Sequence, residues 1–290
     1  MSMTLRIGDL TVHRIVEMEI PFTDPYEFMP TLTPGQLESN RGWLQEMGAL
    51  DPATGRLVLC FQSYVVQTPR HTILVDSCVG NDKDRTGRPA WHMKKDDAWM
   101  RGLAALGLTV ADIDIVMCTH LHVDHVGWNT RLENGRWVPT FPRARYLFSE
   151  REYAYWTAQH AKSPIACIAD SVLPITEAKR ADLVSSTHQV DDHVRLIPTP
   201  GHTPDHFAVE IGRGRTEALL TGDLIHSPLQ ARFPALSMRA DTDPNQAAAT
   251  RRSVLERAAE ERMLCCTAHF PSPSIARFAR SGDGFRCEPA

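Results

Sequence analysis

THLHVDHVGWN, residues 119–129, is the most informative segment of this sequence for its fold. The apolar run before it is typical of a buried strand, so the stretch begins where that strand ends. Within six positions it places three histidines and an aspartate: His120, His122, Asp124 and His125. His120 and His122 stand two apart and therefore point to the same side, and the other two follow where the chain turns. We expect the four side chains to converge.

The residue types in this stretch predict a metal site. Imidazole and carboxylate groups are the ligands that zinc and related divalent ions prefer, and four such groups without a cation would repel one another on desolvation. Three later segments carry the same groups after strand-like runs: His202 in PTPGHTPDH, Asp223 in LLTGDLIHS and His269 in CCTAHFPSP. Because each precedes a turn, all can gather at one edge of the sheets. Five histidines and two carboxylates suffice for two metal ions bridged by one carboxylate.

The composition favours a globular protein with a small-molecule partner. With 290 residues, 42% of them hydrophobic, the chain can bury a substantial core. Its 31 basic and 35 acidic residues form no basic block, which argues against nucleic acid or an anionic membrane as a partner. The first residues, MSMTLRIGDLTVHRIVEME, lack a signal-peptide core and a membrane span, so we expect a cytoplasmic protein. The seven cysteines lack C-x-x-C pairs and are expected to be reduced core residues.

Strand-like apolar runs alternate with helical segments along the chain. The pieces TPRH, after SYVVQT, and GRGRT, after HFAVEIG, predict hairpins that join antiparallel strands. Helices are predicted at 149–160 and 244–263, where Ser149 and Asp243 have the positions of N-caps. Strand pairs with a helix in each half predict two similar layers back to back, and we expect residues 1–290 to form a single domain.

Residues 20–52 form an irregular segment that is rich in proline and turn residues but also holds aromatic side chains, among them Phe28 and Trp43. We expect this segment to cap a pocket or, as the alternative, to pack on the surface or at a homodimer contact. Composition leaves both roles open. In either role the segment is an extension of the same domain.

The order of the motifs resembles the metallo-β-lactamase superfamily. H-x-H-x-D-H at 120–125 is followed by GH at 201–202, GD at 222–223 and AHF at 268–270. Within the superfamily, the sequence looks most like the branch of lactonases and organophosphate hydrolases, which includes the N-acyl-homoserine lactone lactonases and methyl parathion hydrolase. The resemblance implies an α/β fold, a four-layer αβ/βα sandwich, with a di-metal centre on the edge between its sheets.

The resemblance also assigns the seven groups to two divalent metal ions, which we expect to be Zn²⁺. All seven motif positions keep a residue able to bind metal. The implied ligands are His120, His122 and His202 for the first ion, Asp124, His125 and His269 for the second, and Asp223 as the bridge between them.

Two residues beside the motifs are candidates for supporting roles. Asp76, at the end of the run TILVD, is expected to steady a ligand histidine or to serve as a turn residue. In GHTPDH the first histidine, His202, is the implied ligand. The role of His206 stays open, with packing at the start of a strand as one interpretation.

The expected activity is hydrolysis of a small-molecule lactone or a related carboxylic ester. A hydroxide bridging two metal ions would attack the carbonyl carbon, and Asp124 would shuttle the proton as a catalytic residue. In the homoserine-lactone lactonases that the sequence resembles, a tyrosine three residues after the bridging aspartate binds the substrate carbonyl. Here TGDLIH places His226 at that position, where imidazole can donate a similar hydrogen bond. The alternative for His226 is a plain pocket-wall residue.

Other functions remain open on the sequence. The same hydroxide chemistry suits a phosphotriester (organophosphate) hydrolase or a β-lactamase-like activity. From a different class, an iron-dependent persulfide dioxygenase is the less favoured alternative, and the identity and stoichiometry of the bound metal would separate it from a hydrolase. The small excess of acidic over basic residues and the lack of a basic arm disfavour a nuclease.

Overall fold

The computed structural model describes residues 3–289, which form two compact units. The first unit contains the chain up to Met18 together with Phe61–Ser186, and the second contains Glu19–Cys60 together with the chain from Thr187 onward. The chain passes between the units three times: inside two long strands, β2 (Leu10–Thr23) and β3 (Leu57–Gln67), and once more after Ser186. The prediction of a single domain stays a prediction.

The first unit is built on a seven-stranded sheet with the order β1-β2-β3-β4-β5-β8-β9. Strands β3 and β4 form the predicted antiparallel hairpin, whereas β4, β5, β8 and β9 run parallel and need crossover connections. A separate two-stranded hairpin joins β6 to β7. The further strand bounds are β1 Met3–Ile7, β4 Thr72–Val75, β5 Ile115–Met117, β6 Thr130–Glu133, β7 Arg136–Pro139, β8 Arg145–Ser149 and β9 Ala181–Val184.

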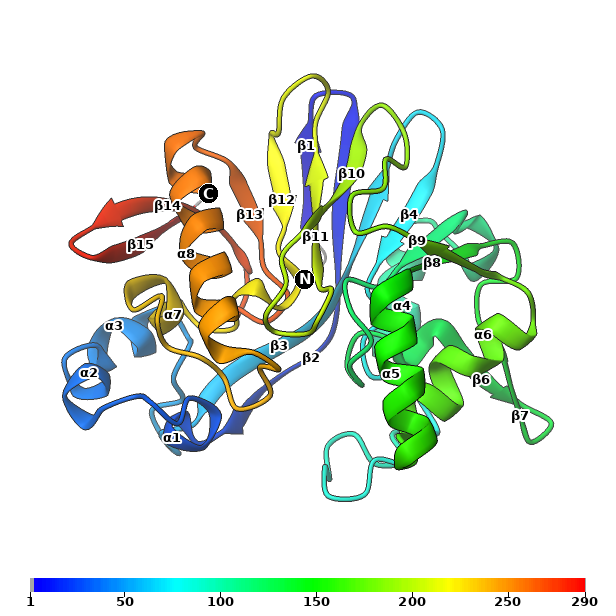
Figure 1. Ribbon diagram of the computed structural model, residues 1–290, viewed down its shortest axis with the longest axis horizontal. Helices are drawn as coiled ribbons and strands as arrows, with labels where there is room; N and C mark the ends of the chain where they lie inside the picture. The colour runs from blue at the N-terminus through cyan, green and yellow to red at the C-terminus, as the bar shows by residue number, and fades with distance from the viewer. Residues whose placement is uncertain (1–2, 290) are drawn as a thin grey trace. The chain divides into compact units, whose positions relative to one another are not determined.

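Helices lie in two of the crossovers of the first unit, between β4 and β5 and between β8 and β9 (Figure 1), whereas the H-x-H-x-D-H loop and the β6–β7 hairpin connect β5 to β8. The buried side chains of Trp99 and Leu103, on one face of α4, share a core cluster with Val116 of β5 and Tyr146 of β8. Helix α5 begins at the predicted N-cap, because the Ser149 hydroxyl accepts the Glu152 N–H at 3.2 Å. The helical bounds are α4 Ala98–Ala105, η1 Val110–Asp112, η2 Gly127–Asn129, α5 Glu150–Lys162, the π-helix η3 Ile168–Val172 and α6 Leu173–Glu177.

The second unit is built on a six-stranded sheet with the order β10-β11-β12-β13-β14-β15. Strands β12 and β13 are parallel and the other neighbouring pairs antiparallel, including the predicted hairpin of β11 and β12. The strand bounds are β10 Val194–Pro198, β11 Phe207–Ile211, β12 Ala218–Leu220, β13 Leu264–Cys266, β14 Ile275–Ser281 and β15 Gly284–Pro289.

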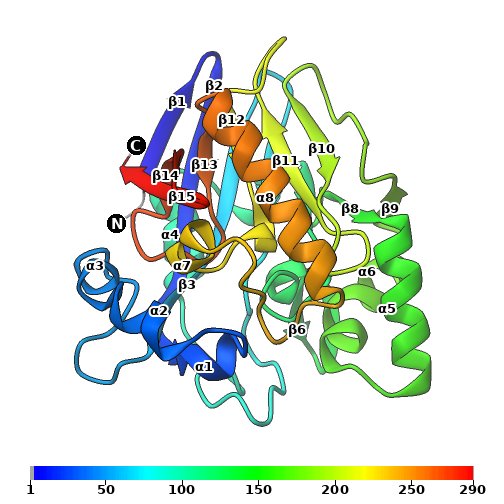
Figure 2. The ribbon, with the colours of Figure 1, turned by 60° about the vertical axis from the view of Figure 1, so that its left-hand side comes forward.

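Helix α8 (Pro244–Glu260) makes the crossover between β12 and β13 and lies across the sheet of the second unit (Figure 2). Asp243 is its N-cap, as predicted, and Pro244 opens its first turn. The buried Leu255 and Ala258 belong to the same core cluster as Leu219 and Phe278 of the sheet. The shorter helices of this unit are α1 Pro25–Phe28, α2 Pro34–Glu38, α3 Arg41–Glu46, η4 Gly222–Leu224 and α7 Pro228–Arg232.

The predicted α/β fold class is confirmed, since each unit combines a sheet with covering helices. Six of the seven cysteines are buried, as expected for core residues. Among residues 3–289, no helix has both the length and the apolar character required to cross a membrane.

Candidate metal centre

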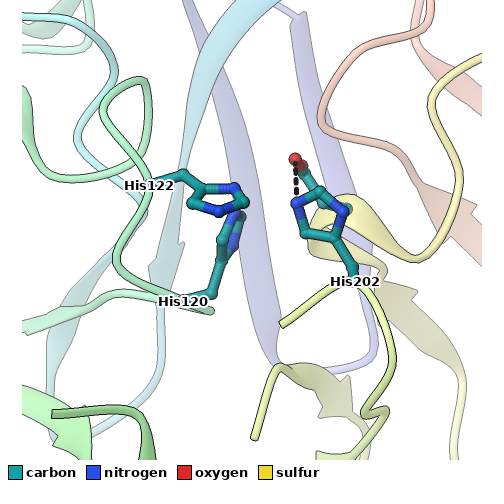
Figure 3. A group of neighbouring side chains, drawn as sticks. His120, His122 and His202 are labelled. Carbon is teal, nitrogen blue, oxygen red and sulfur yellow. Dashed lines mark ion pairs between the residues drawn. The ribbon is translucent and has the colours of Figure 1, made fainter. Parts of the chain in front are cut away.

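The H-x-H-x-D-H loop of the first unit brings its histidines together, as predicted. The loop follows β5, and the side chains of His120 and His125 are almost fully buried. The ring centroids of His120 and His122 lie 4.6 Å apart, and those of His120 and His125 lie 4.1 Å apart. Figure 3 shows the rings of His120 and His122 beside each other. The loop therefore concentrates imidazole nitrogens at the end of a buried strand.

Asp76 holds this loop in place. One oxygen of its carboxylate accepts the Thr119 N–H at 2.8 Å, and the other lies 2.9 Å from His125 Nδ1. The Thr119 hydroxyl donates to Asp76 and lies 3.1 Å from His120 Nδ1. With Nδ1 of His125 bound to a carboxylate, its Nε2 lone pair is the one available to a metal. Asp76 therefore fixes the ring of His125, and that His125 is a metal ligand stays a prediction.

A buried glutamate, Glu17, supports the same loop from β2, and the sequence reasoning missed it. Its carboxylate accepts the Val79 N–H and the Trp128 Nε1–H, each at 2.7 Å, and pairs with Lys94 at 3.1 Å. Burial raises the pKa of Glu17 despite the nearby lysine. The backbones of Val79 and Gly127 also lie very close together, since a Cβ added to Gly127 would lie 1.9 Å from the Val79 carbonyl oxygen. The only sequence signal was an acidic residue within an apolar strand.

Asp223 is the centre of a histidine cluster in the second unit. Its two carboxylate oxygens face three imidazole Nε2 atoms: His202 at 3.2 Å (Figure 3), His226 at 3.0 Å and His269 at 3.0 Å. All four side chains are at most 4% exposed, so the interactions are shielded from water. The ligand atoms of Asp223, His226 and His269 lie within 4.8 Å of one another, a spacing that can hold a metal ion.

The Nδ1 atoms of two of these histidines, on the ring side away from Asp223, lie beside hydrogen-bond acceptors. His202 Nδ1 lies 2.8 Å from an Asp241 carboxylate oxygen, and His269 Nδ1 lies 2.9 Å from the Cys60 carbonyl oxygen. Burial lowers the pKa of His202, but its contacts with Asp223 and Asp241 outweigh burial and raise it to about 9. Asp241 lies in a segment without any motif, and the sequence reasoning did not find it.

The open question about His206 is answered by its contacts. Its Nε2 accepts the backbone N–H of Asp223 at 2.9 Å, and its Nδ1 lies 2.7 Å from the Thr199 hydroxyl. Because both ring nitrogens are engaged, His206 is suited to positioning Asp223 rather than to binding a metal.

His226 differs from the predicted ligands in its surroundings. Its Nδ1 is buried and has no hydrogen-bond partner among residues 3–289, so we place the ring proton on Nε2, where it donates to Asp223. Burial lowers the pKa of His226, which favours the neutral ring. Phe28 contacts this ring edge-on at 5.5 Å, and His269 stacks on it at 5.3 Å. Phe28 belongs to residues 20–52, and which of the two roles expected for that segment it has stays a prediction.

The residues of both units fit divalent metal ions by the chemistry of their donors. Each unit contains imidazole rings whose Nδ1 atom is held by a partner and whose Nε2 atom can face a metal, and each also contains carboxylate oxygens. This set of donors is typical of zinc. The prediction that the two groups form one centre stays a prediction.

The fold and the histidine motif identify the class: the chain belongs to the metallo-beta-lactamase superfamily, whose family model matches residues 62–269. Two curated relatives are N-acyl homoserine lactonases. The one from Bacillus sp is 26% identical over 191 residues, covering 62% of this chain and 62% of the relative. The one from Bacillus cereus is 27% identical over 158 residues, covering 51% of this chain and 56% of the relative. The matches thus span less than two thirds of either relative.

Solved structures share the fold over nearly the whole chain. AidC, described as a dizinc quorum-quenching lactonase in complex with a product, has a TM-score of 0.83 at 20% identity, covering 100% of this chain and 97% of AidC. The hydrolase AbOPH has a TM-score of 0.82 at 22% identity, with the same coverage of both chains. At these identities the likeness establishes the fold.

Proposed function

We propose that this protein is a metal-dependent hydrolase that opens lactones or cleaves related carboxylic esters. The observation that carries the proposal is the arrangement around Asp223, where three imidazole Nε2 atoms face one buried carboxylate. The N-acyl homoserine lactonases among its relatives support lactones as the substrate class.

In this proposal the seven residues implied by the motif order would hold two divalent ions, with zinc expected. A pair of such ions supplies acidified water as a nucleophile and Lewis-acid polarisation of the substrate oxygen. The proposed ligands are those implied by the motif order: His120, His122, Asp124, His125, His202, Asp223 and His269.

The protein side chains would orient the substrate and move protons. Asp124 has a side chain that is 15% exposed, compared with 2% for His125, so its carboxylate is more accessible than the neighbouring imidazole. A carboxylate at this position can accept a proton during attack and return it to the departing alkoxide. His226 would donate a hydrogen bond from its Nε2–H to the substrate carbonyl oxygen. In this structure the same Nε2 lies 3.0 Å from an Asp223 carboxylate oxygen.

A hydrolysis panel on metal-analysed protein tests this function. The panel compares N-acyl homoserine lactones, simple γ- and δ-lactones, aryl esters, phosphotriesters and β-lactams. We expect the highest kcat/KM on a lactone or an aryl ester, whereas a preference for phosphotriesters or β-lactams would move the protein to another activity of the fold. A single bound iron without hydrolysis of any of these compounds would favour oxygen chemistry instead.

Removal of metal is expected to abolish hydrolysis. Exhaustive chelation should reduce the rate to background, because no side chain of the proposed site is itself an activated nucleophile, and added Zn²⁺ should restore it. The measurement is the hydrolysis rate against metal content per chain. Full activity in protein without detectable metal would refute the mechanism.

The role of His226 is tested by two substitutions. His226→Ala removes a hydrogen-bond donor, so we expect kcat to fall about 100-fold, as for loss of one donor to a developing oxyanion. Metal content should stay at the wild-type value. His226→Tyr supplies a phenolic donor and should retain more activity than His226→Ala. Loss of a metal ion from the alanine variant would instead show that His226 is a ligand.

A further inference from the structure

A buried ion pair lies behind His202 in the second unit. Asp241 and Arg251 are paired at 3.8 Å, and their side chains are 0% and 1% exposed. The other oxygen of the Asp241 carboxylate lies 2.8 Å from His202 Nδ1. One carboxylate therefore connects a guanidinium group with the histidine whose Nε2 faces Asp223.

Arg251 projects from α8 and binds two separate segments of backbone. Its Nε donates to the Leu224 carbonyl, directly after Asp223, at 2.8 Å. Its Nη1 donates to the carbonyls of Pro234 and Leu236, each at 2.8 Å. The planar guanidinium group thus holds the loop of Asp223 and the segment that leads to Asp241 in one fixed geometry.

The segment around Asp241 is also fastened directly to the backbone at His202. The Thr242 N–H donates to the His202 carbonyl at 3.0 Å, and the Asp243 N–H donates to the Gly201 carbonyl at 2.9 Å. Gly201 has φ +128°, and a Cβ there would lie 2.2 Å from the backbone nitrogen of Ala247 at the start of α8. Backbone and side-chain contacts therefore fix the same histidine.

Core stability is a weak explanation for this pair. Desolvation of two charges offsets most of their attraction, so apolar side chains of similar volume would serve the core equally well. What an apolar pair would lack is an acceptor for the Nδ1–H of His202. A carboxylate in that position selects the ring tautomer and orientation of a ligand histidine.

We propose that Asp241, anchored by Arg251, is a positioning residue that presents Nε2 of His202 to a metal ion, and that Arg251 couples His202 to the Asp223 loop. The inference rests on the proposed function, because it assigns His202 to a metal site. It adds that contacts of Asp241 and Arg251, within the second unit, set the affinity of the protein for one of the two ions.

Asp241→Asn is the first test, with the metal affinity measured by competition with a chromogenic chelator. The amide keeps the shape but loses the charge that orients His202. We expect the affinity for one of the two Zn²⁺ ions to fall by about 10- to 100-fold and the other to stay at the wild-type value. The matched control is Asp283→Asn, in the exposed turn between β14 and β15 of the same unit, which should keep wild-type affinity for both ions.

A second readout separates positioning from stability alone. Zn²⁺ bound to the native state raises the melting temperature, and the increment depends on its affinity. A merely structural role for Asp241 would lower the melting temperatures of metal-free and metal-saturated protein together. The proposal requires the increment itself to shrink in Asp241→Asn, and an unchanged increment in a folded variant would overturn it.

Arg251→Lys covers the case in which Asp241→Asn does not fold. Lysine keeps the positive charge but lacks the planar fork that reaches Leu224, Pro234 and Leu236. We expect weaker Zn²⁺ binding than in wild type, and wild-type affinity would contradict the coupling. The outcomes are distinct, since a wild-type protein that binds no metal rejects the proposed function, whereas wild-type affinity in the variants rejects only this inference.

Discussion

The Asp223→Asn variant is expected to lose lactone or ester hydrolysis and at least part of its bound metal. Three histidine Nε2 atoms face the two oxygens of this carboxylate, and an amide would turn an NH₂ group toward one or more of them. Loss of a supporting partner of a ligand typically costs 10- to 100-fold, so we expect loss of this proposed bridging ligand to lower kcat/KM by more than about 100-fold. The measurement combines kcat/KM with metal content per chain.

The matched control for this variant is Asp283→Asn, in the exposed turn between β14 and β15 of the same unit. This change removes one negative charge at a surface position and should leave hydrolysis and metal content at the wild-type values. Two bound ions and unchanged kcat/KM in Asp223→Asn would show that Asp223 is not the bridge.

Asp170→Ala is expected to destabilise the first unit by about 3 to 5 kcal/mol, the cost of breaking a buried ion pair. The Asp170 carboxylate binds the Arg85 guanidinium through two hydrogen bonds of 2.7 and 2.9 Å and lies 3.7 Å from Lys83 Nζ. Both cations are nearly inaccessible to water, and burial lowers the pKa of Lys83 to about 7. Without Asp170, the Arg85 charge would remain buried without its carboxylate. The free energy of unfolding, measured by chemical denaturation, checks this result.

An exposed ion pair in the same unit is the control for Asp170→Ala. Arg131 and Glu133 lie 3.0 Å apart with side chains 43% and 51% exposed. Because water screens such pairs, Glu133→Ala should change the free energy of unfolding by less than about 1 kcal/mol. An equally small change in Asp170→Ala would mean that the buried network around Arg85 relaxes or admits water.

Local sequence patterns were sufficient for several features of the fold and the site. Asp243 was recognisable as an N-cap because capping depends on neighbouring residues, and α8 begins there. The convergence of His120, His122 and His125 followed from their place at the end of a predicted strand. Asp76 was a candidate for the same reason, since it ends another strand-like run.

Glu17 and Asp241 were missed because neither belongs to a local pattern. Glu17 contacts Trp128 across 111 residues of sequence, and Asp241 contacts His202 across 39. Each is a single acidic residue that becomes significant only when distant segments pack against it. The same holds for Arg251, which looks like an ordinary helix-surface residue until its 1% exposure is known.

The donor atoms that this protein can offer a metal, and the order in which they occur, could be read from the residue types, because ligand chemistry belongs to the side-chain type. Only the folded structure shows which nitrogen of His125 and of His269 is held and which is presented. His125 is bound by Asp76, 49 residues away, and His269 by the Cys60 carbonyl, 209 residues away. The orientation of an imidazole depends on partners that only folding brings into contact, so no pattern of neighbouring residues encodes it.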